Sequence, residues 1–244
     1  MSRAFPLAAV ALAVLLTLSG CVGGAPSKTP PALPTADASS PSQPVIESDP
    51  LETVSTIVVR PEHLELQDDS GAIVQTLSYD LTLEEYAAAL TIVFDVEPTL
   101  EEYAGSCCES PPATSSQWGG FTVTDDHMGS FADHDQTLWI PEDVPDYRGM
   151  NLSVRVTEPT VGDIQITTMA GFEVGDDVPA LADAVGWPYD PAADHHAIPI
   201  ENGTELGPPE MEGLPNAYSV VVVGPMPDGT FFLTAPMNVG VASV

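Results

Sequence analysis

The sequence predicts an α+β protein built mainly on an antiparallel sheet, with two or three short helices. Short stretches in which apolar and polar residues alternate recur along the chain, as they do in strands with one buried face. Few segments show apolar residues at helical spacing. Hydrophobic residues make up 43% of the 244 residues, which is enough for a core. Runs of strands with few helices favour an α+β fold.

The first element is a short apolar segment at the N-terminus. Arg3 is the only charged residue before Lys28, and residues 4–18 are almost entirely apolar. At about 15 residues this segment is shorter than the roughly 20 residues that a membrane-spanning helix needs. A basic start, a short apolar centre and small residues at the end are typical of a signal peptide, which we assign to residues 1–20.

The apolar segment ends on Leu18-Ser19-Gly20-Cys21. These residues resemble the lipobox of bacterial lipoproteins, Leu-(Ala/Ser)-(Gly/Ala)-Cys, and the overall layout resembles uncharacterised lipoproteins of high-GC Gram-positive bacteria. The resemblance implies that the Cys21 thiol receives a diacylglycerol and becomes the first mature residue. Two acyl chains hold a protein firmly on a bilayer, so we expect a lipid-anchored protein on the extracytoplasmic face of the cell membrane. The alternative is an ordinary secretory signal with an incidental cysteine.

Residues 21–52 are predicted to form a disordered tether. Residues 22–50 are rich in Pro, Ser, Thr and Ala, a composition that builds no core and favours extended, partly polyproline structure. At about 3.1 Å per residue the segment would reach roughly 90 Å when extended, and a flexible coil would average nearer 30 Å. The folded part is therefore expected to stand away from the membrane.

Strand and helix patterns follow the tether. Thr56-Ile57-Val58-Val59 predicts a strand, and residues 63–78 predict a β-hairpin that turns at Asp68-Asp69-Ser70-Gly71. A helix is expected after Thr82, because Thr82 and Glu85 fit a capping box. The apolar residues on one face of this helix are Leu83, Tyr86, Leu90 and Val93.

The hexapeptide Thr-Leu-Glu-Glu-Tyr-Ala occurs twice, at residues 82–87 and 99–104. A repeated hexapeptide allows a functional interpretation. The structural interpretation is stronger, since both copies have the composition of a helix start. We therefore predict a second, short helix at residues 99–104, ended by Gly105.

The second half of the chain returns to strands. They are predicted around Phe121 and Val123, at Leu138-Trp139-Ile140, over Leu152 to Val156, and around Ile164 and Ile166. Residues 176–186 predict a helix with an acidic cap, an early Pro179 and a closing Gly186. A Pro- and acid-rich loop follows. The last element is a hairpin of Tyr218–Val223 against Phe231–Thr234, which turns at Pro227-Asp228-Gly229.

These elements divide into two α+β modules, residues 53–160 and 161–244. Each half contains a short helix, an irregular loop and then strands, so a tandem duplication is one interpretation. Residues 171–188 resemble a Gly-x-x-Val-Gly…Gly-x-Pro pattern of small helix-on-sheet modules, as in the outer-membrane assembly lipoprotein and β-lactamase-inhibitor fold group. The resemblance covers about 20 residues, implies a binding module and assigns no contact residues.

Charge excludes two classes of partner. Acidic residues outnumber basic ones 36 to 5, and the net charge is −31. The basic residues are Arg3, Lys28, Arg60, Arg148 and Arg155. Because they form no cluster, we expect no nucleic-acid partner and no basic surface for anionic lipids. The acidic excess predicts a solvated surface that repels other polyanions, and a dedicated cation-binding surface is the alternative.

Two adjacent cysteines, Cys107 and Cys108, are the most unusual local feature. Adjacent Cα atoms lie about 3.8 Å apart across a trans peptide, whereas disulfides usually span 4.4–6.8 Å. A disulfide between them is therefore possible but strained, and strained bridges are labile. Three interpretations stay open: a vicinal disulfide, free thiols, and a bond between chains or a redox role.

Known metal and catalytic patterns are missing from the sequence. Asp133-His134-Asp135 and Asp194-His195-His196 contain metal-ligand residue types but lack the spacing of known zinc or calcium sites, so we expect no metal and no cofactor. Neither a Gly-x-Ser-x-Gly, a Ser-x-x-Lys nor a glycine-rich phosphate loop is present, so no catalytic residues are assigned. His63 and His127 show no pattern either.

The aromatic residues offer the clearest candidate ligand contacts. Trp118, Trp187 and Tyr189 lie beside Gly or Pro, in predicted loops after the two helices. They are candidates for ligand binding, although aromatic residues more often belong to the core or a sheet edge. The acid-lined residues 125–135 and 187–205 are the next place for a small ligand.

Three functions remain. The leading hypothesis is a membrane-anchored, non-catalytic binding or interaction module whose partner is an envelope protein or a small ligand. The alternative is a cell-envelope hydrolase that uses paired carboxylates, which would need two acids with raised pKa in one cleft. Solute capture for a transporter ranks last, since the folded part is small for the usual two-lobed design.

Overall fold

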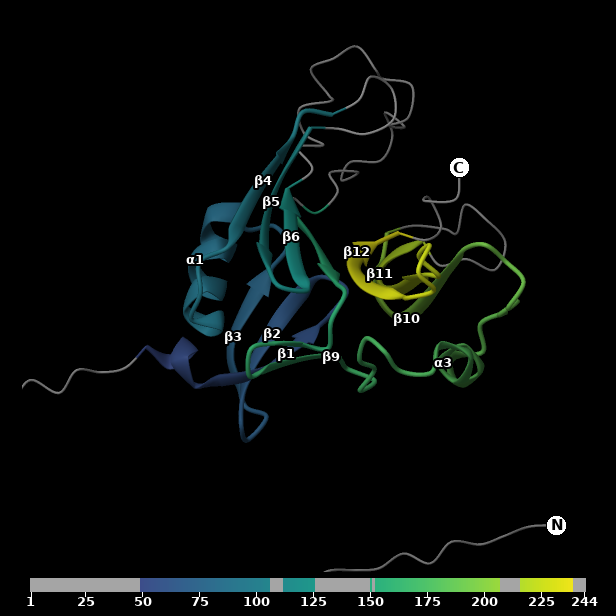
Figure 1. Ribbon diagram of the computed structural model, residues 1–244. Helices are drawn as coiled ribbons and strands as arrows, with labels where there is room; N and C mark the ends of the chain where they lie inside the picture. Colours follow the sequence, from purple (N-terminus) through teal and green to yellow (C-terminus); the bar gives the residue numbers. More distant parts are fainter. Residues whose placement is uncertain (1–48, 106–111, 126–149, 151, 207–215, 239–244) are drawn as a thin grey trace, which may run out of the picture. The chain divides into compact units, whose positions relative to one another are not determined.

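The computed structural model describes residues 49–105, 112–125, 150, 152–206 and 216–238. Within these ranges the chain forms two sheets, two α-helices and one short 3-10 helix (Figure 1). The expected signal peptide, Cys21 and nearly all of the tether lie outside the described residues. So do Cys107, Cys108 and the strand expected at residues 138–140.

Sheet A contains five strands in the order β3-β2-β1-β9-β8. Their bounds are β1 Val54–Val59, β2 His63–Asp68, β3 Ile73–Ser78, β8 Thr160–Val161 and β9 Ile164–Thr168, and the 3-10 helix η1 Pro50–Thr53 precedes β1. β1 pairs antiparallel with β2 and parallel with β9. The predicted strand at 56–59 and the predicted hairpin at 63–78 are therefore present. The hairpin turns where Gly71 adopts a positive φ of 79°.

Sheet B contains seven strands in the order β10-β11-β12-β7-β6-β5-β4, and every pair in it is antiparallel. Their bounds are β4 Thr99–Tyr103, β5 Ala113–Trp118, β6 Phe121–Asp125, β7 Leu152–Val156, β10 His196–Glu205, β11 Ala217–Gly224 and β12 Phe232–Met237. The described residues thus form the predicted α+β fold with mainly antiparallel sheets.

Alternation of side chains explains the strands that the sequence predicts well. In β7, Leu152, Val154 and Val156 are buried while Arg155 between them is exposed. One face of the strand therefore enters the core and the other does not. The hairpin of β11 and β12 was also predicted, and it turns over residues 226–230.

Three strands of sheet B were not predicted as strands: β4, where the sequence predicts a helix, and β5 and β10, which lie in predicted loops. β10 occupies part of what the sequence indicates as a loop, because Pro199 and Asn202-Gly203 are turn-forming residues. The strand accommodates them with two shifts of register against β11. β5 reads Ala-Thr-Ser-Ser-Gln-Trp and shows little apolar alternation. Tertiary pairing with β4 and β6 makes it a strand.

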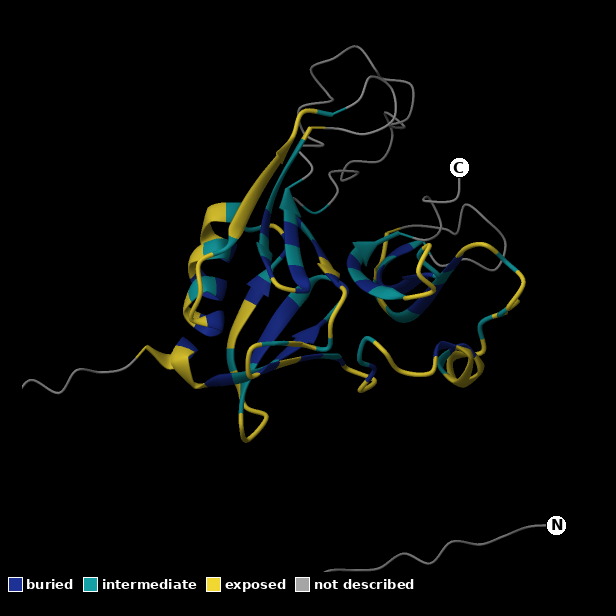
Figure 2. Cartoon of the chain, in the orientation of Figure 1, coloured by how far each residue is buried: buried dark blue, intermediate teal, exposed yellow. Residues whose placement is uncertain are grey.

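One hydrophobic core contains buried residues from both sheets and both α-helices (Figure 2). Helix α1, Leu83–Phe94, contacts both sheets. Its Tyr86 hydroxyl donates a 2.8 Å hydrogen bond to the carbonyl of Leu77 in β3. Its Phe94 ring lies 5.7 Å, between centroids, from Trp118 in β5 and equally far from Phe121 in β6. Aromatic packing from one helix thus helps to hold the two sheets together.

Local hydrogen bonds at the N-terminus of α1 explain why the helix starts there. The Thr82 hydroxyl accepts a hydrogen bond from the Glu85 amide, and the Glu85 carboxylate accepts one from the Thr82 amide. This is the predicted capping box. The Thr82 amide and the Thr82 hydroxyl both donate to the Glu85 carboxylate, at 3.0 and 2.9 Å, and these two hydrogen bonds lower the pKa of Glu85. The helix predicted at residues 176–186 is also present as α3, Val178–Val185, capped by Asp177 and ended by Gly186 in the left-handed conformation.

The helix predicted at the second hexapeptide is wrong, because residues 99–103 form strand β4. In the first copy, seven further helical residues follow Ala87 and bury Leu90 and Phe94. In the second copy Gly105, at a φ of 79°, leaves too few residues for a stable helix. Pairing with β5 satisfies the backbone groups along one edge of the second copy instead.

The two copies allow a matched test of the capping box. We expect Thr82→Ala to lower the free energy of unfolding by about 1 kcal/mol, because it removes the cap of α1. Thr99→Ala changes the same residue of the second copy, which lies in an exposed strand, and we expect less than about 0.5 kcal/mol. Urea denaturation followed by circular dichroism measures both. Equal losses would contradict the assignment of different roles to the two copies.

The predicted division at residue 160 does not separate two sheets. β9 follows that boundary and pairs with β1, and β12 follows it and pairs with β7. The described residues cluster into one compact unit. Each α-helix precedes a three-stranded meander of sheet B, β4–β6 after α1 and β10–β12 after α3. The tandem duplication stays a prediction.

Candidate functional site

Trp118, a predicted ligand contact, lies in the core at the end of β5. Its side chain is 2% exposed, and its indole Nε1 donates a 3.0 Å hydrogen bond to the carbonyl of Val96. The ring packs on Phe94. Trp118 therefore supports the packing of α1 on sheet B, and little of its ring is available to a ligand.

The other two aromatic candidates lie after helix α3. Trp187 packs against the core, and its amide donates a hydrogen bond to the carbonyl of Ala182 at the end of α3. Tyr189 stacks on His196 with ring centroids 4.4 Å apart, and His196 Nε2 lies 2.8 Å from the carbonyl oxygen of Asp190. Trp187 and Tyr189 are half-buried, whereas Trp118 is almost fully buried.

The predicted histidine clusters form no metal centre in the described ranges. His195 is exposed while its neighbour His196 is buried against Tyr189, so the two residues lie in different environments. Within those ranges no three His, Cys, Asp or Glu side chains are placed to hold a metal ion together. His127, and Asp133-His134-Asp135, lie outside them.

The most extensive polar contact joins the two sheets, at the turn between β1 and β2. The Arg60 guanidinium donates to Glu65 Oε1 in β2 and, at 2.7 Å, to Glu201 Oε1 in β10. Glu62 Oε1 in the same turn accepts a 3.0 Å hydrogen bond from the Thr204 amide. We call this contact the turn–β10 junction, and it consists of Arg60, Glu62, Glu65, Glu201 and Thr204.

Close backbone approach explains a glycine beside this junction. A Cβ on Gly203 would lie 2.9 Å from Pro61 Cβ, closer than carbon atoms normally approach. Gly203 therefore lets β10 lie directly on the β1–β2 turn. Tyr79 also stabilises the turn, because its hydroxyl donates a 3.1 Å hydrogen bond to the Arg60 carbonyl. Burial raises the pKa of this tyrosine, so Tyr79 remains a neutral hydrogen-bond donor.

Opposite charges dominate the electrostatics of the junction. Partial burial by itself would lower the pKa of Arg60, but the hydrogen bond and charge of Glu201, followed by those of Glu65, outweigh it and raise that pKa. The His63 ring lies 3.6 Å from Glu65 Oε1, and Gln67 Nε2 donates to Glu65 Oε2 at 2.9 Å. Arg60 therefore pairs with two carboxylates, Glu65 of sheet A and Glu201 of sheet B, and so holds the two sheets together.

This arrangement leaves one acceptor without a partner. Glu201 Oε2 is buried and makes no hydrogen bond with any described residue. The sequence contains no signal for the junction, because Arg60 and Glu201 are 141 positions apart and β10 was predicted as a loop. Its chemistry is that of a structural ion-pair network rather than of a carboxylate pair facing a cleft.

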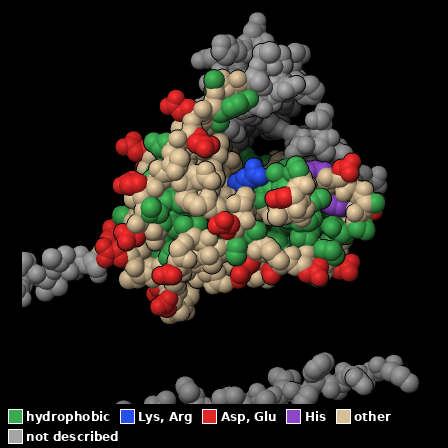
Figure 3. Space-filling model, in the orientation of Figure 1, with side chains coloured by type: hydrophobic (Ala, Val, Ile, Leu, Met, Phe, Trp, Pro, Cys, Tyr) green, Lys and Arg blue, Asp and Glu red, His purple; other side chains and the backbone are tan. Residues whose placement is uncertain are grey.

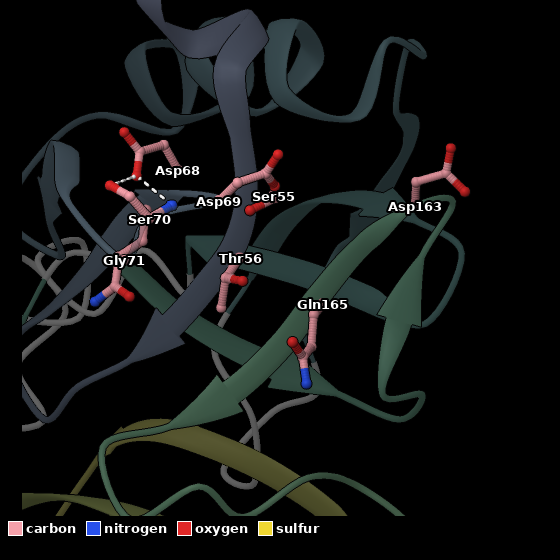
Figure 4. A pocket seen from close by; sticks show the side chains of 9 residues that line it. Ser55, Thr56, Asp68, Asp69, Ser70, Gly71, Asp163 and Gln165 are labelled. Carbon is pink, nitrogen blue, oxygen red and sulfur yellow. Dashed lines mark hydrogen bonds between the residues drawn. The ribbon is translucent and has the colours of Figure 1, made fainter.

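A shallow polar pocket of about 540 Å³ lies on sheet A beside the β2–β3 turn (Figure 4). It is lined by Ser55, Thr56, Gln67, Asp68, Asp69, Ser70, Gly71, Asp163 and Gln165. The Asp68 carboxylate faces its own turn and bonds Ser70, while Asp163 lies on the far side and points away from it. The acids do not converge on one point, so the pocket does not form a carboxylate pair.

The Asp68 carboxylate is tied to its turn by three hydrogen bonds. The Ser70 hydroxyl, the Ala72 amide and the Ser70 amide donate to Asp68 Oδ1 at 2.7, 3.0 and 2.9 Å, and together they lower the pKa of Asp68 below its usual 3.8. A lowered carboxyl pKa stabilises the fold above the usual value and loses that contribution as pH falls through the native pKa. We expect the Asp68 carboxyl carbon to titrate below pH 3.8 by NMR. A midpoint at or above this value would contradict the hydrogen bonding of the turn.

The outer surface is acidic, with apolar side chains between the charges. Figure 3 shows acidic side chains spread over the face drawn and one small basic area. The described ranges contain two basic residues, Arg60 at the junction and Arg155 on β7. Arg155 lies over the Phe232 ring, 4.0 Å from its centroid. Both basic residues are therefore engaged within the fold.

Comparison of the chain with protein-family models, with curated proteins and with solved structures finds no match. None of the helices in the described ranges is long and apolar enough to cross a membrane.

Proposed function

We propose that this protein is a lipid-anchored, extracytoplasmic module that binds another protein rather than catalysing a reaction. The observation that carries the proposal is the open edge of sheet B. Strand β4 ends the sheet with all five of its residues exposed, and none of the described strands pairs with its outer edge. Exposed strand edges present unpaired amide and carbonyl groups to which another chain can add.

The anchor follows from Leu18-Ser19-Gly20-Cys21. A diacylated Cys21 and an extended tether would hold the folded unit near the bilayer while leaving its surface accessible. The net charge of −31 gives the unit no attraction to anionic headgroups, so the acyl chains would be its means of attachment.

The hydrolase alternative finds less support. A general acid needs a raised pKa, yet each described carboxyl group whose pKa is shifted has it lowered, by hydrogen bonds with Ser70, Thr82 or Thr230. Glu65 and Glu201, the two acids that contact Arg60 at the junction, share its guanidinium. Binding is therefore the function that the described geometry favours.

The test uses cells that produce the full chain with a C-terminal tag. Labelling with radioactive palmitate should mark the protein and should fail for Cys21→Ala, whereas Cys107→Ala/Cys108→Ala keeps the lipobox and serves as the matched control. Crosslinking of intact cells should then recover a protein that is lost with Cys21→Ala. Label on Cys21→Ala would refute the anchor, and the absence of any crosslinked protein from every variant would refute the binding function.

A further inference from the structure

Four strands form the edges of the two sheets, and three of them are protected from pairing. β8 in sheet A has two residues. β3, at the other end, lies against η1 and α1, and Tyr86 of α1 donates to its Leu77 carbonyl. β10 in sheet B contains Pro199 and two register shifts. Short length, covering elements, prolines and bulges are the devices that keep edges from binding other chains.

The fourth edge, β4, lacks these devices, and the protection that it carries is the charge of Glu101 and Glu102. It contains no proline, and its five residues pair with β5 in an unbroken register from Thr99 opposite Gln117 to Tyr103 opposite Ala113. Leu100 is 67% exposed and Tyr103 is 50% exposed, so both large side chains are accessible to another chain. Figure 2 shows the whole strand as exposed. A regular, accessible edge of this kind is a template for an added strand.

The acids of β4 define which chain can be added. Glu101 and Glu102 occupy the centre of the strand between Leu100 and Tyr103. Antiparallel pairing of β4 with a second copy about its central residue would place Glu101 opposite the Glu101 of the other copy, and like charges opposite each other are destabilising. The net charge of −31 adds to this repulsion. Lys or Arg opposite these acids would instead be favourable.

We propose that the edge of β4 binds an extended segment of another protein in which two consecutive basic residues lie between apolar residues. The segment would pair its backbone with β4 and extend sheet B by one strand. Its basic residues would face Glu101 and Glu102, and its apolar residues would cover Leu100 and Tyr103. This inference rests on the proposed binding function and names its surface and the chemistry of its partner.

The binding experiment uses the purified full chain in nonionic detergent and the labelled peptide Thr-Val-Lys-Lys-Val-Thr. The peptide reads the same in both directions, so parallel and antiparallel pairing bring Lys-Lys to the same place. We expect saturable binding by fluorescence anisotropy and slower hydrogen exchange confined to the amides of β4. Peptides with Glu-Glu or with proline in the centre should bind at least about tenfold more weakly.

Charge reversal provides the decisive variant. Glu101→Lys/Glu102→Lys should lose about tenfold in affinity for the Lys-Lys peptide and should prefer the Glu-Glu peptide. Glu52→Lys/Asp163→Lys changes the net charge equally at two exposed acids away from β4, and we expect its affinity to stay within about twofold. Both pairs lie on the surface, so circular dichroism should show unchanged folding.

Three results would overturn the inference. One is unchanged peptide preference after charge reversal, and another is slower exchange in residues away from β4. The third is a dimer of the wild-type chain in sedimentation experiments that is abolished by a proline within β4, since a second copy would then occupy the edge.

A crosslinking experiment in cells separates this inference from the proposed function. A benzophenone amino acid replaces Tyr103 in one variant and Met169, which is 66% exposed and lies outside the strands, in another. We expect a crosslinked protein with a Lys- or Arg-containing strand from position 103. A partner crosslinked from position 169 but not from position 103 would overturn the β4 site and leave the binding function standing. If no protein is crosslinked from position 103 or from position 169, the result counts against the β4 site and against the binding function.

Discussion

Arg60→Met is expected to lower the free energy of unfolding by about 3 kcal/mol. The substitution keeps an apolar stem of similar length but leaves Glu65 and Glu201 close together without their shared cation. Removing one partner of a buried ion pair typically costs about 3–5 kcal/mol, and the lower end applies here because the Arg60 side chain is 22% exposed. Urea denaturation of the full chain, followed by circular dichroism, measures the loss.

The same substitution at the other described arginine is the control. Arg155 is exposed on β7, lies over Phe232 and approaches Met226 Sδ at 3.9 Å. We expect Arg155→Met to cost less than about 1 kcal/mol, the range of exposed cation–π contacts. Adding Glu201→Gln to Arg60→Met should restore part of the stability, because it removes one of the two repelling charges. Equal effects of both arginine substitutions would show that the junction does not hold the sheets together.

Trp118→Ala is expected to cost about 4 kcal/mol, the largest effect of any single change considered. The substitution removes a ring that is 2% exposed and leaves a cavity against Phe94, for which large-to-small changes cost about 3–5 kcal/mol. It also leaves the Val96 carbonyl without its donor. Trp118→Phe restores most of the packing but not the hydrogen bond, and we expect it to cost about 1.5 kcal/mol.

Trp187→Ala is the matched control for the core. Trp187 is half-buried after α3, so we expect it to cost about half as much as Trp118→Ala. Thermal unfolding followed by far-ultraviolet circular dichroism avoids dependence on tryptophan fluorescence. If Trp118→Ala left stability unchanged and abolished binding of a partner, Trp118 would be a ligand contact as the sequence predicted.

Local patterns in the sequence were sufficient to predict most of the helices and strands. The capping box of Thr82 and Glu85 determines where α1 begins, and Asp177 and Gly186 determine both ends of α3. The alternation in β7 determines which of its side chains enter the core. These signals work because caps, turns and strand faces depend on residues a few positions apart. The lipobox-like residues that end at Cys21 are an equally local signal. The proposal of a lipid anchor therefore comes from the sequence.

Tertiary structure decided what local patterns leave open. The two hexapeptides have identical sequences, yet Tyr86 is buried in a helix and Tyr103 is exposed in a strand. β10 has turn-forming residues and becomes a strand by pairing with β11, and only that pairing brings Glu201 to Arg60. The physical reason is that a short segment has only a weak intrinsic preference for helix or strand. Backbone pairing with distant segments, and burial against them, contribute more free energy than this preference and therefore decide which structure forms. The acidic edge of β4 could therefore be found only in the folded chain.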